Sequence, residues 1–423
     1  MNDTHHDLII VGAGIAGLAA ALTSSRAGAP TLVLDAHDIG GRARTAERDG
    51  FLHNIGPHAL YRSGALAKLL REHDIRVAGH RPDVGAPAML RDDRLTPVSM
   101  KAMALMRTPL LPLSGRIRLL KLLASMQRTD PAKLVGTTVD QWLGGQPVHV
   151  RQFADFLVRL STYSNDPADL DAGAALGQVQ LALGSSVDYL HGGWGSMIDS
   201  MASTVRERGV AIESHVEVTG VERLGDRWLV SAGARSFTAD AVVLAVGGPA
   251  LVQRLSGRPV TGADQLTAPA TATCLDLAVN PGRPLVAFGL DQPLYLSAHS
   301  PGARLAPEGS GLVSVLRYIP VGTEPADATT ARHELREFAR LAGIADRDIV
   351  HERYLHQVVV HHGGPSARGG GLAGRPGVDA LGNDGIAIAG DWVGEVGFIA
   401  DASAASGAVA AAAALTRLGR VAA

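Results

Sequence analysis

The sequence predicts an α/β fold in which a Rossmann-like domain, with a parallel sheet and a β-meander, is interleaved with an α+β domain. Three observations lead to this prediction. An apolar run at residues 8–11 is followed by three closely spaced glycines, and a second apolar run at 31–34 ends on an acid. Far along the chain, residues 386–391 repeat the pattern of an apolar strand that ends in a turn.

The first glycine turn has the spacing of a dinucleotide-binding site. Gly12 permits a tight turn, Gly14 lets the backbone approach a pyrophosphate, and Gly17 lets the following helix, expected over 15–27, pack against the sheet. Asp35 falls where a carboxylate can accept hydrogen bonds from a ribose diol. Because strand, turn, helix and acid occur together, the motif indicates a dinucleotide but does not say which one.

Composition indicates a globular chain with no dominant electrostatic field. Of the 423 residues, 46% are hydrophobic and 19% are charged, and the net charge is −2, so nothing points to nucleic acid as a partner. The single cysteine, Cys274, excludes an intrachain disulfide framework and fits a reducing compartment. We recognise no signal peptide and no stretch that must span a bilayer, so the expected location is cytoplasmic.

Two further glycine segments follow the first strand–helix unit. In residues 38–45, Gly40 and Gly41 allow close backbone approach, and Arg42 can donate to a phosphate. In residues 50–61, Gly56-Pro57-His58 forms a turn that could press backbone onto a flat ring, and His58 is either a ligand-facing donor or an ordinary loop histidine.

The stretch 98–128 has six basic residues and no acid, with leucines and methionines between them. Two short basic amphipathic helices are expected here. They could form a membrane-surface patch, but a helical cap on the second domain with its charges in water is the favoured interpretation.

The remaining patterns suggest how the two domains interleave. Residues 210–248 alternate as a small antiparallel meander that ends in a buried parallel strand, and 272–319 alternate as a second sheet. Predicted domain bounds are 1–90, 205–265 and 355–423 for the Rossmann-like domain, and 91–204 and 266–354 for the other.

The C-terminal unit contains most of the remaining polar candidates. After the strand at 386–389 come Gly390 and Asp391, and Asp401 suits the N-cap of an alanine-rich buried helix. Four histidines precede this unit, and their spacing without acid or cysteine partners makes a metal site the less favoured interpretation. A histidine that reaches a cofactor is favoured instead, with His361 or His362 the ones to test.

Taken together, these segments resemble the superfamily of flavin-containing amine oxidases and phytoene desaturases. The resemblance rests on VGAGIAG with Asp35, on GGRART at 40–45, on NIGPHALY at 54–61, and on AGDWVG…ADASAASG at 389–407, with support from YLHGGWGSMIDSMA at 189–202. It implies FAD, an oxidoreductase, and a divergent substrate domain in the regions where the likeness is weak.

The resemblance also implies roles for individual residues. The first glycine turn would line the pyrophosphate, Asp35 would hold the adenosine ribose, Val216 would offer backbone to adenine, and Asp391 would bind the ribityl or pyrophosphate segment. The N-terminus of the last helix would face the flavin pyrimidine, where it stabilises the charge of a reduced ring. The full predicted cofactor shell is Gly12, Ala13, Gly14, Ile15, Ala16, Gly17, Asp35, Ala36, Gly41, Arg42, Gly56, Pro57, His58, Val216, Gly390, Asp391, Asp401 and Ala402.

Departures from the family pattern bear on the substrate. Many amine oxidases hold a water near flavin N5 with a lysine, yet this chain has no lysine after Lys133, and its aromatic content is only 4%, so a two-tyrosine cage is not evident. Asn54 stands where desaturases often have an acid. The catalytic candidates are His58, His361 and Trp392, the last of which could equally be ordinary packing.

The predicted function is hydride transfer from an apolar small molecule, such as an isoprenoid or a polycycle, to flavin N5. Oxygen, a quinone or another carrier would reoxidise the flavin. Two alternatives remain open at this point: a non-redox isomerase that uses reduced flavin, and a non-catalytic lipid-binding module on the same scaffold.

Overall fold

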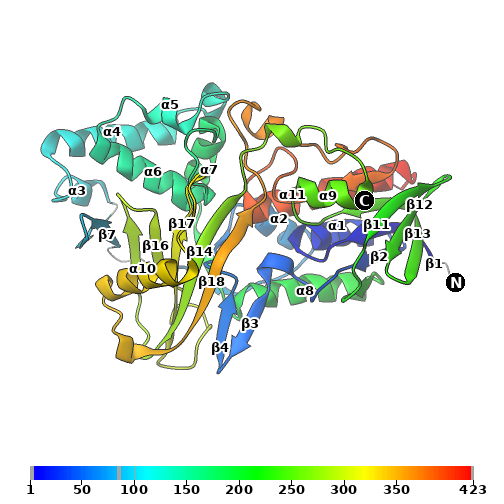
Figure 1. Ribbon diagram of the computed structural model, residues 1–423, viewed down its shortest axis with the longest axis horizontal. Helices are drawn as coiled ribbons and strands as arrows, with labels where there is room; N and C mark the ends of the chain where they lie inside the picture. The colour runs from blue at the N-terminus through cyan, green and yellow to red at the C-terminus, as the bar shows by residue number, and fades with distance from the viewer. Residues whose placement is uncertain (1–3, 83–86, 100, 421–423) are drawn as a thin grey trace.

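The computed structural model describes residues 4–82, 87–99 and 101–420. It has two lobes, which lie at opposite ends of the long axis in Figure 1. One contains the parallel sheet with helices α1 and α11, and the other contains a second sheet with a helical cap. The chain crosses between them several times, as the interleaved prediction requires.

The parallel sheet has the order β10-β2-β1-β13, and β19 adds parallel to the far half of β13. Its inner strands are buried on both faces, which explains their continuous apolar runs. β13 also belongs to the meander: one of its edges pairs parallel with β1 over residues 237–244, while the other pairs antiparallel with β12 over 235–239 and parallel with β19 over 242–244. The bounds are β1 Thr4–Val11, β2 Thr31–Leu34, β10 Ala211–Glu213, β11 Gly220–Leu224, β12 Arg227–Ala232, β13 Arg235–Leu244 and β19 Ile386–Ile388.

Three helices cover one side of this sheet, and their apolar side chains form a single core with those of the strands. They are α1 (Ile15–Arg26), α8 (Gly193–Glu207) and α11 (Ile399–Arg417). By length and composition α11 could cross a membrane. However, its small side chains pack on α1 so closely that a Cβ on Gly407 would lie 2.1 Å from the Ala16 carbonyl oxygen, so α11 is a core helix here.

The second sheet has the order β18-β14-β17-β16-β15-β7-β8. Alternate residues enter different cores: Cys274 and Leu316 face the helices α4, α6 and α7, whereas Leu275 and Val315 face α10. This period of two is what a sheet covered on both faces requires. The bounds are β7 Ala88–Arg91, β8 Arg94–Pro97, β14 Ala270–Val279, β15 Val286–Gly289, β16 Leu294–Ala298, β17 Gly311–Tyr318, β18 Ile349–His361 and α10 Ala328–Leu341.

The helical cap of the second lobe and the small ribbons between the lobes complete the fold. The cap helices are α3 Ala102–Leu105, α4 Leu113–Arg128, α5 Val139–Leu143, α6 Val148–Thr162 and α7 Ala172–Gly184. The other elements are β3 Thr45–Arg48, β4 Phe51–Asn54, β5 Leu60–Tyr61, β6 Gly79–His80, β9 Val187–Leu190, α2 Ala65–Glu72 and α9 Pro249–Ser256.

Three predicted domain boundaries fall inside single elements. A cut at 354/355 divides β18, although β18 pairs with β14 along its length, and a cut at 90/91 divides β7, which belongs to the second sheet. A cut at 204/205 divides α8, whose buried face joins the α1–α11 core. Sequence alternation does not reveal which lobe a strand or helix packs against, so these limits were misplaced.

Candidate flavin and substrate site

The β1–α1 turn is an open cradle built from glycines. Gly12 has φ 104°, and a Cβ there would lie 2.3 Å from the Ala245 carbonyl oxygen. A Cβ on Gly17 would lie 1.8 Å from the Gly12 oxygen, whereas one on Gly14 would meet no atom within 4 Å. The space beside Gly14, at the N-terminus of α1, is therefore open, as an anion site requires.

Asp35 closes the cradle from the end of β2. Its carboxylate accepts from the Ala13 N–H (2.6 Å) and from the His37 N–H (2.8 Å), and Ala36 follows it directly. The Asp35 carbonyl accepts from the Val216 N–H at 2.8 Å. Because this N–H is bonded, only the carbonyl of Val216 could contact adenine, and that contact stays a prediction.

The second glycine segment packs against the first. The Gly40 N–H donates to the Ala13 carbonyl (2.8 Å), and a Cβ on Gly41 would lie 3.5 Å from the Gly14 Cα. Arg42 extends from this segment to Asp391, with 3.0 Å between its guanidinium and the carboxylate, and also donates to the Val360 carbonyl. The N-terminal and C-terminal motifs therefore meet directly.

Asp391 is a buried anion held by three donors. Besides Arg42, the backbone N–H of His362 donates at 3.1 Å and the His362 ring lies at 3.2 Å. Burial alone would raise the pKa of Asp391, but the charge of Arg42 and the contacts to His362 hold that pKa well below its usual range. Asp391 is thus ionised, and Gly390 before it is fixed by Ser406 of α11.

The turn Gly56-Pro57-His58 is anchored from both lobes. The Asn54 side-chain oxygen accepts from the backbone N–H of Trp194 in α8 (2.9 Å) and from the Thr45 hydroxyl (2.7 Å). Arg353 of β18 donates to the Asn54 carbonyl and to the buried carboxylate of Asp276. Asn54 therefore acts as a structural acceptor that holds β3, β4 and α8 together.

Close packing and stacking fix the same turn. A Cβ on Gly56 would lie 3.3 Å from Cys274 Sγ, so the turn rests on β14. His58 bonds back to the Gly56 carbonyl (2.9 Å), and its ring lies 4.7 Å from that of Trp194. Burial lowers the pKa of His58, so it is a neutral ring beside the turn.

Two residues of the C-terminal unit do not act as predicted. Trp392 is fully buried and its indole N–H donates to the Gly247 carbonyl (2.8 Å), so this side chain packs in the sheet core and cannot face a substrate. Asp401 is not the N-cap of α11, because the helix begins at Ile399 after Phe398. Its carboxylate instead accepts from the Leu66 N–H in the first turn of α2 (2.8 Å), and Ala402 beside it is fully buried.

His361 is the residue of this shell whose polar atoms most clearly need a further partner. It lies at the end of β18, it is 2% exposed, and neither ring nitrogen has a partner among the described residues. Burial lowers its pKa to about 4. Because buried polar atoms are normally hydrogen-bonded, a bound group that reaches this ring would complete the site.

Four tyrosines that the sequence did not single out lie near one another and form what we call the tyrosine wall: Tyr163 and Tyr318 of the second lobe, and Tyr61 and Tyr189 of the ribbons β5 and β9. Burial raises the pKa of Tyr163 well above its ordinary value, and the nearby phenols of Tyr318, Tyr61 and Tyr189 raise it further. The rings of Tyr163 and Tyr318 are 5.8 Å apart, and the Tyr318 hydroxyl is buried without a partner among the described residues. These tyrosines come from different elements, so no local sequence signal brings them together.

A cavity of about 500 Å³ lies between α7, the start of α2 and the start of α11. Its lining is largely apolar, with Leu372, Leu181 and Phe398, and its polar groups include Asp171, Gln178 and Asp401. Gln178 also contacts the hydroxyl of Tyr61, so one side of the cavity adjoins the tyrosine wall. A small apolar molecule fits this space.

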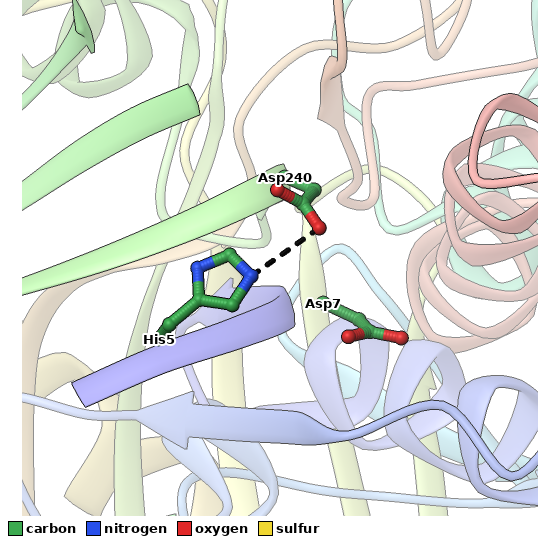
Figure 2. Close-up of side chains that lie close together, drawn as sticks. All are labelled: His5, Asp7 and Asp240. Atoms are coloured by element: carbon green, nitrogen blue, oxygen red, sulfur yellow. Dashed lines mark ion pairs between the residues drawn. The ribbon is translucent and has the colours of Figure 1, made fainter. Parts of the chain in front are cut away.

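The described residues also contain one group with metal-ligand geometry, at the opposite end of β1 from the glycine turn (Figure 2). His5 Nε2 lies 3.4 Å from the Asp240 carboxylate, while Asp7 points to the side and pairs with Arg420. Asp240 is also shared with Arg227 (3.8 Å). These ion pairs account for the cluster, and the expectation that the protein has no metal site stays a prediction.

Comparison with known proteins agrees with the geometry. The chloroplastic protoporphyrinogen oxidase of Nicotiana tabacum is 30% identical over 177 residues, which cover 41% of this chain and 32% of that protein. The coproporphyrinogen III oxidase of Propionibacterium freudenreichii subsp. freudenreichii is 44% identical over 72 residues, which cover 16% of this chain and 14% of that protein. The chain therefore matches no more than about a third of the length of either relative.

Solved structures show the same fold. The cyclohexylamine oxidase of Brevibacterium oxydans superposes with a TM-score of 0.69 at 18% identity, over 98% of this chain and 100% of that one. Residues 15–415 match the family model described as flavin-containing amine oxidoreductase. The chain therefore belongs to this family: it is an FAD-dependent oxidoreductase.

Proposed function

We propose that this oxidoreductase dehydrogenates an apolar, ring-bearing small molecule, with porphyrinogens as the first class to test. A single observation carries the proposal. The cavity is largely apolar and adjoins the tyrosine wall, and the buried carboxylates Asp276 and Asp391 are already paired with arginines. The other buried carboxylates are Asp166, Asp171, Asp188 and Asp401, of which Asp188 pairs with Arg62, while Asp171 and Asp401 accept from backbone N–H groups.

The residues around the glycine cradle fit FAD. The open face at Gly14 and the free first turn of α1 suit a pyrophosphate, and the unpartnered ring of His361 suits a polar edge of a bound group. FAD supplies a two-electron acceptor when it is bound. The protein's part is to hold that acceptor against the Gly56-Pro57-His58 turn and to keep water away from it.

An amine is the less favoured substrate. The chain has four lysines, at positions 68, 101, 121 and 133, and all four are exposed, so none is available to hold a water in the site. The cavity is largely apolar, and its two buried carboxylates, Asp171 and Asp401, already accept from backbone N–H groups. The two curated relatives reported above are named as porphyrinogen oxidases, which supports a porphyrinogen as the first candidate.

The test is anaerobic bleaching of the purified flavoprotein. Porphyrinogen, isoprenoid, steroid and amine candidates are added in turn, and the visible flavin absorbance is followed. Bleaching by a porphyrinogen or another apolar candidate, and not by the amines, is expected. Bleaching by amines alone overturns the proposed substrate class. Readmission of oxygen, or addition of a quinone, then identifies which acceptor restores the colour.

A matched pair of variants connects the result to the tyrosine wall. Tyr318→Phe removes the buried hydroxyl that has no partner in the described structure. Tyr354→Phe is the control, because this phenol bonds to the exposed His356 at 2.9 Å. Slower bleaching in the first variant alone would support the wall as the substrate surface, and equal rates would contradict it.

A further inference from the structure

The helical cap carries an apolar tip that is separate from the flavin shell. Four large apolar side chains are strongly exposed there: Met103 of α3 (67%), Leu113 (61%) and Ile117 (43%) of α4, and Val148 (73%) at the start of α6. Soluble proteins rarely gather such residues on one surface without a partner. Figure 1 places α3 and α4 at the far end of the long axis from β11 and β12.

Specific contacts bring these segments together. Arg116 of α4 donates to the Leu111 carbonyl (2.8 Å) and to the Met106 carbonyl (3.1 Å), which fixes the segment between α3 and α4. The ring of His149 lies so close to Gly115 that a Cβ there would come within 2.6 Å of it. The start of α6, with Val148, therefore lies beside the first turns of α4.

The charge around the tip is positive and uncompensated. Residues 98–128 contain six cations and no acid, and none of the six forms a salt bridge with any residue that the structure describes. The contrast is α10, where Arg332, Arg336 and Arg340 all pair with carboxylates of Glu352 or Asp346. The exposed cations of the cap are Lys101, Arg107, Arg118, Lys121 and Arg128.

We propose that this cap surface docks on an anionic lipid bilayer. The apolar side chains would enter the headgroup layer while the surrounding cations meet lipid phosphates, which is the composition of an interfacial amphipathic helix. The inner face of α4, with Leu119, Leu122 and Met126 buried on α6 and α7, would stay in place, so docking needs no refolding. The protein would thereby reach an apolar substrate that dissolves in the membrane.

The test is flotation of the full-length, FAD-loaded protein with two kinds of vesicle. One is phosphatidylcholine alone, and the other is phosphatidylcholine mixed with phosphatidylglycerol. Binding is expected only to the mixed vesicles, and it should weaken at about 1 M salt, where charges are screened beyond about 3 Å. Absence of binding to the mixed vesicles overturns the proposal.

Variants separate the two parts of the surface. Leu113→Asp with Ile117→Asp should abolish flotation at any salt concentration. Arg107→Gln with Lys121→Gln should weaken it roughly fivefold for each cation removed. The control is Val350→Asp with Arg347→Gln, an exposed apolar–basic pair at the start of β18 and outside the cap, which should float like the unaltered protein.

Three further readouts separate lipid binding from other causes of a changed result. The flavin spectrum of each variant shows whether the protein is folded and loaded, and anaerobic bleaching tests the proposed substrate independently of lipid. Light scattering reports the oligomeric state. A dimer that dissociates in Leu113→Asp without any vesicle binding would mean that the tip joins two copies, and this would overturn the lipid proposal.

Discussion

The carboxylate of Asp401, in the first turn of α11, accepts a hydrogen bond from the backbone N–H of Leu66 in the first turn of α2 (2.8 Å). A residue near the C-terminus thus caps a helix near the N-terminus. The fit is close, since a Cβ on Gly64 would lie 2.4 Å from this carboxylate. Burial raises the pKa of Asp401 to about 6, and the bonds from α2 only partly offset this.

Replacing Asp401 should therefore have a pH-dependent effect on stability. Asp401→Ala removes the cap and should lower the free energy of unfolding by about 1 kcal/mol. Asp401→Asn keeps an acceptor but does not titrate. Since the folded protein binds this proton more tightly than the unfolded chain, the stability contributed by the protonated carboxyl is lost as pH rises through about 6.

The measurement is urea denaturation at pH 5 and at pH 7.5. Relative to the original protein, the Asn variant should gain stability as pH rises between these values, by at most about 1.4 kcal/mol per pH unit. A difference that stays constant with pH would show that Asp401 is ionised throughout.

Gly14 and Gly17 of the first glycine turn should respond differently to substitution. Gly17→Ala places a Cβ 1.8 Å from a backbone oxygen, so the variant should fold poorly. A side chain on Gly14 meets no protein atom within 4 Å, so Gly14→Val should fold but occupy the space of the pyrophosphate. Asp35→Ala should likewise lower FAD retention, because it removes the acceptor of the Ala13 N–H.

Far-ultraviolet circular dichroism and flavin content distinguish these outcomes. Gly14→Val should give a near-native spectrum with little bound FAD, whereas Gly17→Ala should lose both. Gly28→Ala is a control for the loss of a glycine in the same unit, since a Cβ there also meets open space, although its φ of 61° will cost some stability. Full flavin content in Gly14→Val would contradict the placement of the pyrophosphate.

The sequence could predict these local features because each depends on neighbours in the chain. The cradle needs three glycines and an acid at fixed spacing, and the meander needs alternating apolar residues and a turn. Both patterns can be recognised in the sequence, and the structure contains both elements. Fold class, family and FAD follow from such patterns.

The features that were missed depend on contacts between distant segments. Asp401 looks like an N-cap in sequence, and only its approach to α2 shows that it caps a different helix. Trp392 follows the cofactor motif, yet its side chain turns into the sheet core. The tyrosine wall joins residues 61, 163, 189 and 318, which no periodicity connects.

Buried histidines should make the folded protein sensitive to acid. Burial lowers the pKa of His53 to about 4, helped by the charges of Arg353, His351 and Arg48, while the Asp276 carboxylate lies 4.0 Å away. The unfolded chain binds this proton near pH 6.5, so stability is present above that value and is lost as pH falls from about 6.5 to about 4. His361 should add to the loss in the same window.

The free energy of unfolding, measured from pH 7.5 down to pH 4.5, should fall most steeply in the lower half of this range. His53→Gln should make the slope shallower by up to about 1.4 kcal/mol per pH unit. His356→Gln is the control, because this histidine of β18 is exposed. An unchanged slope in His53→Gln would show that His53 is charged in the folded protein.

Replacing His361 should stabilise the flavin-free protein but weaken its binding of FAD. Its two ring nitrogens are buried without a partner in the described structure, so the empty protein carries an unsatisfied polar group. His361→Leu removes that cost and should stabilise the flavin-free form by about 1–2 kcal/mol. If FAD completes the hydrogen bonds of this ring, the same change should weaken FAD binding.

Denaturation of the flavin-free protein and titration with FAD measure the two effects separately. His362→Leu is the comparison, because the ring of His362 is already bonded to Asp391 at 3.2 Å and its loss should weaken both forms. A His361→Leu variant that is less stable without flavin, or that binds FAD unchanged, would mean that this ring is ordinary packing. If the flavin-free variant is more stable and FAD binds to it more weakly, His361 contacts the cofactor. Replacing a histidine with a purely structural role would not stabilise the flavin-free protein and weaken FAD binding at the same time.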